Sequence, residues 1–181
     1  LWKEWFTTVD HKKIGIMYMI LGLIMFVRGF ADAVMMRLQQ AMAFNGSEGY
    51  LNAHHYDQIF SAHGVIMIFF VAMPLVTGLM NFVVPLQIGA PDVSFPRLNA
   101  FGFWITQVGV LAMLAGFLTP GGAADFGWTM YMPLADATHT PSVSANLWII
   151  GVGATGIGTV ASAVNMLTTV LTLRAPGMTM F

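Results

Sequence analysis

Four long apolar stretches, separated by polar connections, limit what this chain can fold into more than any other feature. A helix needs about 20 apolar residues to cross the roughly 30 Å hydrocarbon core of a bilayer. The stretches at about 14–36, 59–84, 99–118 and 145–173 each have that length. Lipid offers no partners to backbone N–H and C=O groups, so each stretch must be helical where it crosses. The sequence therefore predicts an all-α integral membrane protein with four transmembrane helices.

The composition agrees with this prediction and excludes several kinds of function. Hydrophobic residues make up 57% of the chain and charged residues only 8%, against roughly 25% charged residues in a soluble domain. A net charge of −1 provides no basic surface for nucleic acid. The absence of cysteine excludes disulfides, thiolate metal sites and iron–sulfur clusters. We expect membrane lipids, and not nucleic acid, around the helices.

The distribution of positive charge predicts how the chain is oriented. With four spans, both ends and the middle connection lie on one side, where five basic residues are found: Lys3, Lys12, Lys13, Arg97 and Arg174. The outer connections, 37–58 and 119–144, have only Arg37. By the positive-inside rule both ends are cytoplasmic. We expect an aromatic belt at the outer edge, formed by Trp128, Tyr131 and Trp148.

Two residue types within the spans have structural explanations. Pro74 predicts a kink in the second span, because proline cannot donate a backbone hydrogen bond. Small residues in the fourth span allow close helix contact, and we favour packing over function for them: Gly151, Gly153, Gly156 and Gly158.

Charges inside the first span mark a candidate site. Arg28 and Asp32 are four residues apart, so they share a helix face and can pair. They lie about 21 and 27 Å along the span, toward its outer edge. His55 and Gln58, just before the second span, are expected at that same edge. Two interpretations are open: a buried ion pair that only holds two helices together, or a functional site formed by the four side chains.

A quinol would need this set of groups. It is confined to the bilayer by its apolar tail, and each of its two oxygens loses a proton as electrons leave. A guanidinium, a carboxylate, an imidazole and an amide at a lipid-accessible edge supply hydrogen-bond donors and a proton acceptor. We therefore predict a quinol site at this position.

Two further polar positions each allow two interpretations. His63 is the only histidine within a predicted span, and it could be a hydrogen-bonded core residue or an axial haem ligand. Near the cytoplasmic side, Asn81, Asp92 and Asn99 surround the middle connection. Asp92 could cap a helix. Alternatively, the carboxylate and amides could hold a chain of ordered water that carries protons inward.

Three motifs extend the interpretation to a family. The stretch "AHGVIMIFFVAMPLVTGLMNFVVPLQIGAPDVSFPRLN", together with "LRAPGM" and "VDHKKIG", resembles subunit I of the haem-copper oxygen reductases. This resemblance covers the whole chain. It implies a partial subunit I fold within a larger helical bundle, oxygen reduction to water, proton pumping and a bacterial cytoplasmic membrane. It also implies that these 181 residues are a fragment, inactive alone.

The resemblance assigns roles to residues in these motifs. The histidine of "AHG", His63, would ligate the iron of the low-spin haem, expected to be haem b, and Arg37 in "MMR" would lie beside that haem. The aspartate of "IGAPD", Asp92, would be the entrance of a proton pathway. Asparagines would line it: Asn81, Asn99 and, in "VNMLTT", Asn165. A high-spin haem and copper would be bound by spans outside this sequence.

The electron donor separates the members of this family. "RGFAD" and "HHYDQ" resemble the bo-type ubiquinol oxidases, whose quinol site uses the residues that match Arg28, Asp32, His55 and Gln58. The expected partners are then quinol from the lipid phase, oxygen and other oxidase subunits. Three alternatives are a cytochrome c oxidase, a transporter without haem that uses the ion pair, and a two-haem cytochrome b. The last would need paired histidines in its spans.

Overall fold

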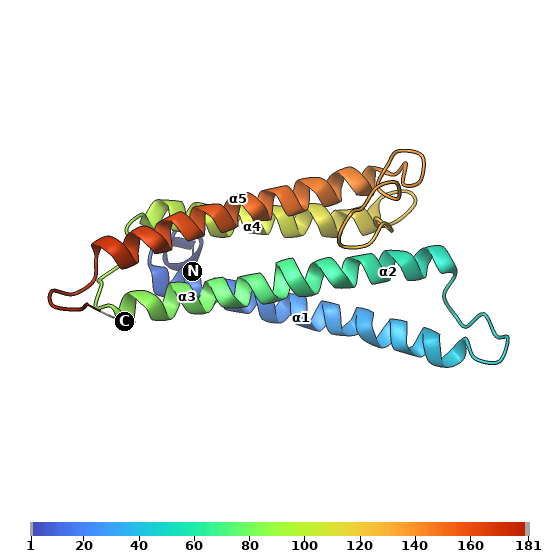
Figure 1. Ribbon diagram of the computed structural model, residues 1–181, viewed down its shortest axis with the longest axis horizontal. Helices are drawn as coiled ribbons and strands as arrows, with labels where there is room; N and C mark the ends of the chain where they lie inside the picture. The colour runs from blue at the N-terminus through green and yellow to red at the C-terminus, as the bar shows by residue number, and fades with distance from the viewer. Residues whose placement is uncertain (1, 180–181) are drawn as a thin grey trace.

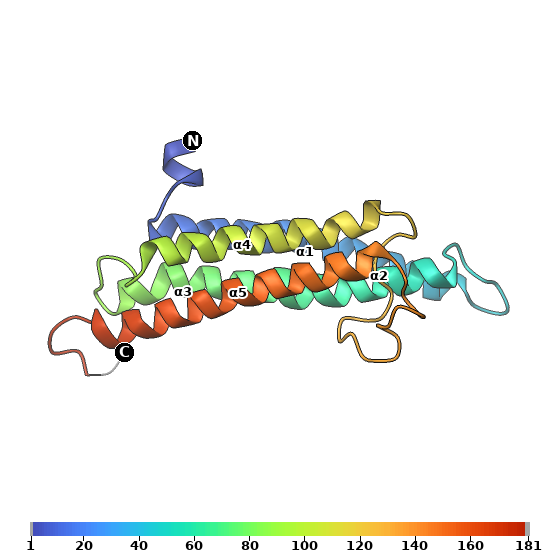
Figure 2. The same cartoon turned by 90° about the horizontal axis from the view of Figure 1, so that it is seen from above.

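The computed structural model describes residues 2–179, and its regular elements are all helical. In chain order they are η1 (Trp2–Phe6), α1 (His11–Met42), α2 (Ala53–Val65), η2 (Ile66–Ala72), α3 (Met73–Gln87), α4 (Pro96–Ala115), η3 (Gly116–Leu118) and α5 (Val143–Thr172). Figures 1 and 2 show an elongated bundle with both chain ends at the same end of it. We call this the terminal end, and the end with the connections 43–52 and 119–142 the loop end.

Four helical segments are long and apolar enough to cross a membrane: His11–Met42, Ala53–Gln87, Pro96–Leu118 and Val143–Thr172. The prediction of four spans is confirmed, but several helices extend beyond the apolar stretches. The first helix begins after Asp10, whose carboxylate accepts the N–H of Lys12, and the second after Asn52, whose side chain accepts the N–H of His55. Such N-caps satisfy the free N–H groups of a first turn, so polar residues can continue the helix outward.

The second span is one continuous helix with a π-helical segment, η2, directly before Pro74. The N–H of Met73 reaches the carbonyl of Ile68, five residues earlier. Because Pro74 has no N–H to donate, the usual spacing of helical bonds is interrupted there, and a local widening of the helix accommodates the interruption. The structure shows a π segment at this position, and the kink stays a prediction.

The bundle consists of two helix pairs. In the first, α1 packs against η2 and α3; in the second, α4 packs against α5. Glycines bring the backbones of each pair into contact. A Cβ on Gly15 would lie 2.8 Å from the carbonyl oxygen of Gly78, and one on Gly151 would lie 2.8 Å from that of Gly109. No side chain fits between these backbones, so each pair is fixed by close backbone approach.

Packing is confirmed as the role of only some glycines in the fourth span. A Cβ on Gly158 would lie 2.7 Å from the hydroxyl oxygen of Thr106. Within residues 2–179, a Cβ built on Gly153 or Gly156 has no atom within 4 Å. Packing at these two glycines stays a prediction.

The structure agrees with only part of the predicted aromatic belt. Trp128 and Tyr131 lie on the surface, as a belt requires. Trp148 is only 7% exposed and packs edge-on against Phe126, with ring centroids 5.1 Å apart. The 119–142 connection, to which Phe126 belongs, therefore covers the start of α5. Trp148 belongs to the hydrophobic core, together with residues of the second span such as Phe70.

Candidate functional site

Arg28 and Asp32 form the predicted ion pair on one face of α1, with the Arg28 Nη1 donating to Asp32 Oδ1. The Asp32 side chain is 0% exposed, whereas the Arg28 side chain is 35% exposed. The second carboxylate oxygen of Asp32, Oδ2, has no hydrogen-bond partner within residues 2–179. A buried polar atom without a partner is costly, so this oxygen is a free acceptor directed into the protein beside a half-exposed cation.

Phe117 is a neighbour of this pair that the sequence did not indicate. It lies in η3, after α4, and its ring centroid is 5.1 Å from the guanidinium carbon of Arg28. A cation over an aromatic face is attracted by the ring quadrupole. Phe117 therefore holds Arg28 from a helix pair other than its own. No local pattern could have shown a contact between residues so far apart along the chain.

His55 and Gln58 lie in the first turns of α2, where their side chains meet at 3.4 Å. Gln58 is buried, and its Nε2 donates to the carbonyl oxygen of Gly121 at 2.6 Å. That nitrogen also lies 2.9 Å from His54 Nε2, and His54 Nδ1 lies 3.1 Å from a carboxylate oxygen of Asp125. These residues thus form a polar cluster that attaches α2 to the 119–142 connection.

The level of the predicted quinol-site residues can be compared through His63, whose Nδ1 contacts the carbonyl oxygen of Gly29, next to Arg28. Asp32 is three residues beyond Gly29 and Gln58 five residues before His63, which places them about 4.5 and 7.5 Å nearer the loop end. Asp32 and Gln58 therefore lie at similar levels. Within residues 2–179 no hydrogen bond joins the ion pair to His55 or Gln58, and a common site stays a prediction.

One short segment, residues 117–122, contacts both the Arg28–Asp32 ion pair and Gln58. Phe117 lies against Arg28, and the Gly121 carbonyl accepts from Gln58. A Cβ on Gly122 would lie 2.7 Å from Gln58 Oε1, so the backbone lies directly on that amide. The segment 117–122 is therefore a wall shared by the ion pair and the α2 polar cluster.

His63 has the geometry of a metal ligand whose second nitrogen is fixed. It is half-buried, and its Nδ1 lies 3.0 Å from the carbonyl oxygen of Gly29. An Nδ1–H that donates to this carbonyl leaves Nε2 unprotonated and able to bind a metal, an arrangement typical of ligating histidines. Among the described residues no group of three or more His, Asp or Glu side chains could hold an ion. A single imidazole of this kind fits an axial haem ligand better than a protein-only metal site.

Arg37, predicted to lie beside the haem, is exposed near the loop end of α1. Its Nη1 donates to Gln40 Oε1 at 2.8 Å. Its place beside a haem stays a prediction.

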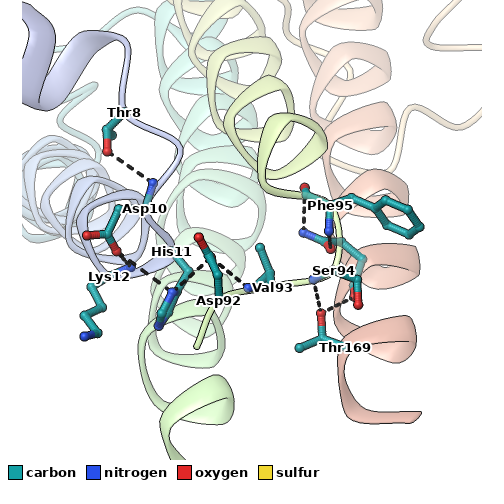
Figure 3. A network of polar contacts seen from close by, with 10 residues as sticks. Thr8, Asp10, His11, Lys12, Asp92, Val93, Ser94, Phe95 and Thr169 are labelled. Atoms are coloured by element: carbon teal, nitrogen blue, oxygen red, sulfur yellow. Dashed lines mark hydrogen bonds and ion pairs between the residues drawn. The ribbon is translucent and has the colours of Figure 1, made fainter. Parts of the chain in front are cut away.

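At the terminal end, Asp92 is bound to the start of α1 and does not cap a helix (Figure 3). Its Oδ1 accepts the N–H of Val93 at 2.7 Å and lies 3.1 Å from His11 Nδ1. The N-cap of α4 is Phe95, which makes no side-chain cap bond. The helix-cap interpretation of Asp92 was therefore wrong.

The three asparagines near Asp92 differ in how their amides are used. Asn99 is 0% exposed, and neither of its amide atoms has a partner within residues 2–179. Asn81 donates to the carbonyl of Thr77 in its own helix. Asn165 accepts the N–H of Phe95 at 2.8 Å and donates to its carbonyl at 3.3 Å. Asn99 thus has an amide that ordered water could satisfy, whereas Asn165 fixes the α3–α4 connection to α5.

The fold and these sites define an all-α, multi-pass membrane protein with a buried carboxylate and a half-buried histidine in its spans. Residues 13–181 match the family described as "Cytochrome C and Quinol oxidase polypeptide I". The chain belongs to this family, which is subunit I of the haem-copper oxidases. Membership leaves the transporter and the two-haem cytochrome b without support.

The similar proteins include oxidases with both kinds of electron donor. The chain is 59% identical over 180 residues to cytochrome c oxidase subunit 1 of Corynebacterium diphtheriae, covering 99% of this chain and 31% of that protein. It is 56% identical over 181 residues to cytochrome bo(3) ubiquinol oxidase subunit 1 of Buchnera aphidicola subsp. Schizaphis graminum, covering 100% and 27%. It is 53% identical over 180 residues to ubiquinol oxidase subunit 1 of Acetobacter aceti, covering 99% and 27%. The chain thus spans less than a third of the length of these relatives.

Proposed function

We propose that this chain is part of subunit I of a terminal oxidase that oxidises quinol, reduces oxygen to water and pumps protons across a bacterial cytoplasmic membrane. Asp32 is the observation that carries the choice of quinol. Its carboxylate is buried in a span, pairs with a half-exposed arginine, and keeps one oxygen free of partners among the described residues. Intramembrane charges of this kind mark substrate sites and proton relays more often than mere structure.

The chemistry of quinol oxidation fits the groups present. As electrons leave a quinol, each hydroxyl must lose a proton to an acceptor. Asp32 Oδ2 can accept a hydrogen bond from one hydroxyl and then its proton, while Arg28 stabilises the negative charge that develops on the oxygen. His55 and Gln58, nearer the loop end, would serve the oxygen at the other end of the ring.

A low-spin haem, expected to be haem b, would receive the electrons and would be held by His63. When bound, it supplies a one-electron acceptor beside the quinol. Gly29 fixes the His63 ring through its carbonyl and directly follows Arg28 in α1. Substrate site and haem ligand would therefore be adjacent. Later parts of the subunit would bind the high-spin haem and copper at which oxygen reacts, and other oxidase subunits would complete the enzyme.

Protons would enter at the terminal end, past Asp92. This orientation is supported by the basic residues that gather there, which predict a cytoplasmic location. Inward from Asp92, the unpartnered amide of Asn99 supports a path through ordered water. Asn81 and Asn165 would belong to the walls of that path.

Cytochrome c is the second candidate donor, because one of the similar proteins at 59% identity is named a cytochrome c oxidase subunit. The test is oxygen consumption by the complete enzyme with a short-chain quinol or with reduced cytochrome c. Quinol-dependent turnover that Asp32→Asn abolishes is the expected result. Turnover with cytochrome c alone would refute the quinol site and leave the oxidase assignment intact.

A further inference from the structure

His11, the first residue of α1, is buried to an extent unusual for a polar residue at a helix start. It is 1% exposed, and its Nδ1 lies 3.1 Å from Asp92 Oδ1 across 81 residues of sequence (Figure 3). Asp10 also approaches this nitrogen, at 3.9 Å, but its carboxylate already accepts the N–H of Lys12. The His11 ring is therefore fixed between the start of α1 and the α3–α4 connection.

The other ring nitrogen of His11 lacks a partner in the part of the chain that the structure describes. Nε2 is buried, and within residues 2–179 it makes no hydrogen bond. A neutral imidazole carries one N–H and one acceptor nitrogen. With Nδ1–H donating to Asp92, Nε2 is the acceptor, which an ordered water can satisfy. The ring cannot reverse these roles without losing its bond to the carboxylate.

Asp92 depends on this contact because it has few others. The segment that follows it is held on the opposite side by α5, where Thr169 accepts the N–H of Ser94 at 2.9 Å (Figure 3). The Asp92 carboxylate itself is 36% exposed, and its only other hydrogen bond in the described chain comes from the N–H of the next residue, Val93. Without His11, no other described side chain would fix the direction of the carboxylate.

We propose that His11 is a positioning residue for proton uptake at Asp92. The inference rests on the proposed role of Asp92 as the entrance of the proton pathway. The Nδ1–H of His11 holds Oδ1, so Oδ2 stays free to take a proton from outside water and release it to water further in. In this role His11 keeps the carboxylate in one orientation.

Two variants of the complete enzyme separate this role from simple packing. In His11→Asn, the side-chain Nδ2 can occupy the place of the imidazole Nδ1 and donate to Asp92. In His11→Leu, a side chain of similar volume has no donor. Proton uptake would be followed with a pH-indicator dye after an oxygen pulse, and the haem spectrum would report correct assembly. We expect about tenfold slower uptake for His11→Leu, the effect of one lost hydrogen bond to a charged group, and near-normal uptake for His11→Asn.

A matched control lies at the loop end. His139 Nδ1 is 2.8 Å from a carboxylate oxygen of Asp136, and this hydrogen bond holds the pKa of Asp136 below its usual range. His139→Leu removes the same kind of pair away from the proposed pathway and should leave uptake unchanged. Equal impairment in His11→Asn and His11→Leu would overturn the inference, because the donor would then not matter.

Asp92→Asn separates a failure of the proposed proton entrance at Asp92 from a failure of the positioning role of His11. Undiminished proton uptake in Asp92→Asn would refute the proposed entrance itself, and the His11 inference with it. Uptake that is lost in Asp92→Asn but stays within about twofold of normal in His11→Leu would refute the positioning role alone.

Discussion

Asp32→Asn tests the central claim about electron donation, and its effect can be estimated from the structure. The carboxylate has two acceptor oxygens, one taken by Arg28 and one free among the described residues. Asparagine has a single acceptor oxygen, which Arg28 would take. The free position would then hold an NH₂ group, which donates and cannot accept the proton of a quinol hydroxyl.

Replacing the acceptor oxygen by an NH₂ group removes the proton acceptor, and this sets the expected loss of quinol oxidation. A positioned acid or base contributes about 100-fold to 10,000-fold to a reaction rate. We therefore expect kcat/KM for quinol to fall at least about 100-fold, which is a loss of about 2.7 kcal/mol of transition-state stabilisation. Because asparagine has nearly the volume of aspartate and still bonds to Arg28, haem content should be unchanged.

The assay is oxygen consumption by the full-length enzyme over a range of quinol concentrations, alongside the optical spectrum of the haems. Asp136→Asn, a carboxylate at the loop end, is the control and should behave as wild type. A donor that reduces the haem directly should still support turnover in Asp32→Asn. The reasoning is refuted if kcat/KM for quinol stays within about threefold of wild type in an enzyme with intact haems.

Three other substitutions test separate parts of the structure. His63→Ala should abolish the low-spin haem spectrum, and an unchanged spectrum would exclude this residue as a ligand. Phe117→Ala removes the ring over Arg28, a contact worth about 0.5–2 kcal/mol, so KM for quinol should rise several-fold. The control is Leu118→Ala, at a neighbouring residue that is 88% exposed, which should leave KM unchanged. Gly151→Ala places a methyl group 2.8 Å from a backbone oxygen and should destabilise the enzyme by about 1–3 kcal/mol. Thermal unfolding followed by haem release would measure this. The control is Gly153→Ala, where a Cβ has no atom of the described residues within 4 Å, and equal effects of the two substitutions would contradict the close packing of α4 on α5.

The spans were predictable because apolar length is a local property of the sequence. The ends of the helices were harder, since polar residues such as His55 and Gln58 continue α2 beyond its apolar part. Asn52 was the available signal: it stands directly before the helix as a residue type that caps N-termini well. With the helix begun there, His55 and Gln58 fall in its first two turns.

Contacts between distant segments were not predictable from patterns. The pairing of Arg28 with Asp32 follows from their four-residue spacing, but Phe117 beside Arg28 depends on how α4 packs against α1. The same holds for His11 and Asp92, which meet only because the α3–α4 connection folds onto the start of α1. Trp148 looked like an interfacial residue because the sequence does not show that Phe126 covers it.

The order of the helix pairs has a consequence for how the protein is made. Each tight pair joins neighbours in the sequence, α1 with the second span and α4 with α5, so each can form as a hairpin while the ribosome is still adding the rest. The contacts of Arg28 with Asp32 and of His63 with Gly29 lie within the first hairpin, and His11 can meet Asp92 once the α3–α4 connection has been made. The contact of Phe117 with Arg28 joins the two hairpins. The residues proposed to handle electrons and protons could therefore be arranged early in synthesis, and docking of the second hairpin would then close the site around Arg28.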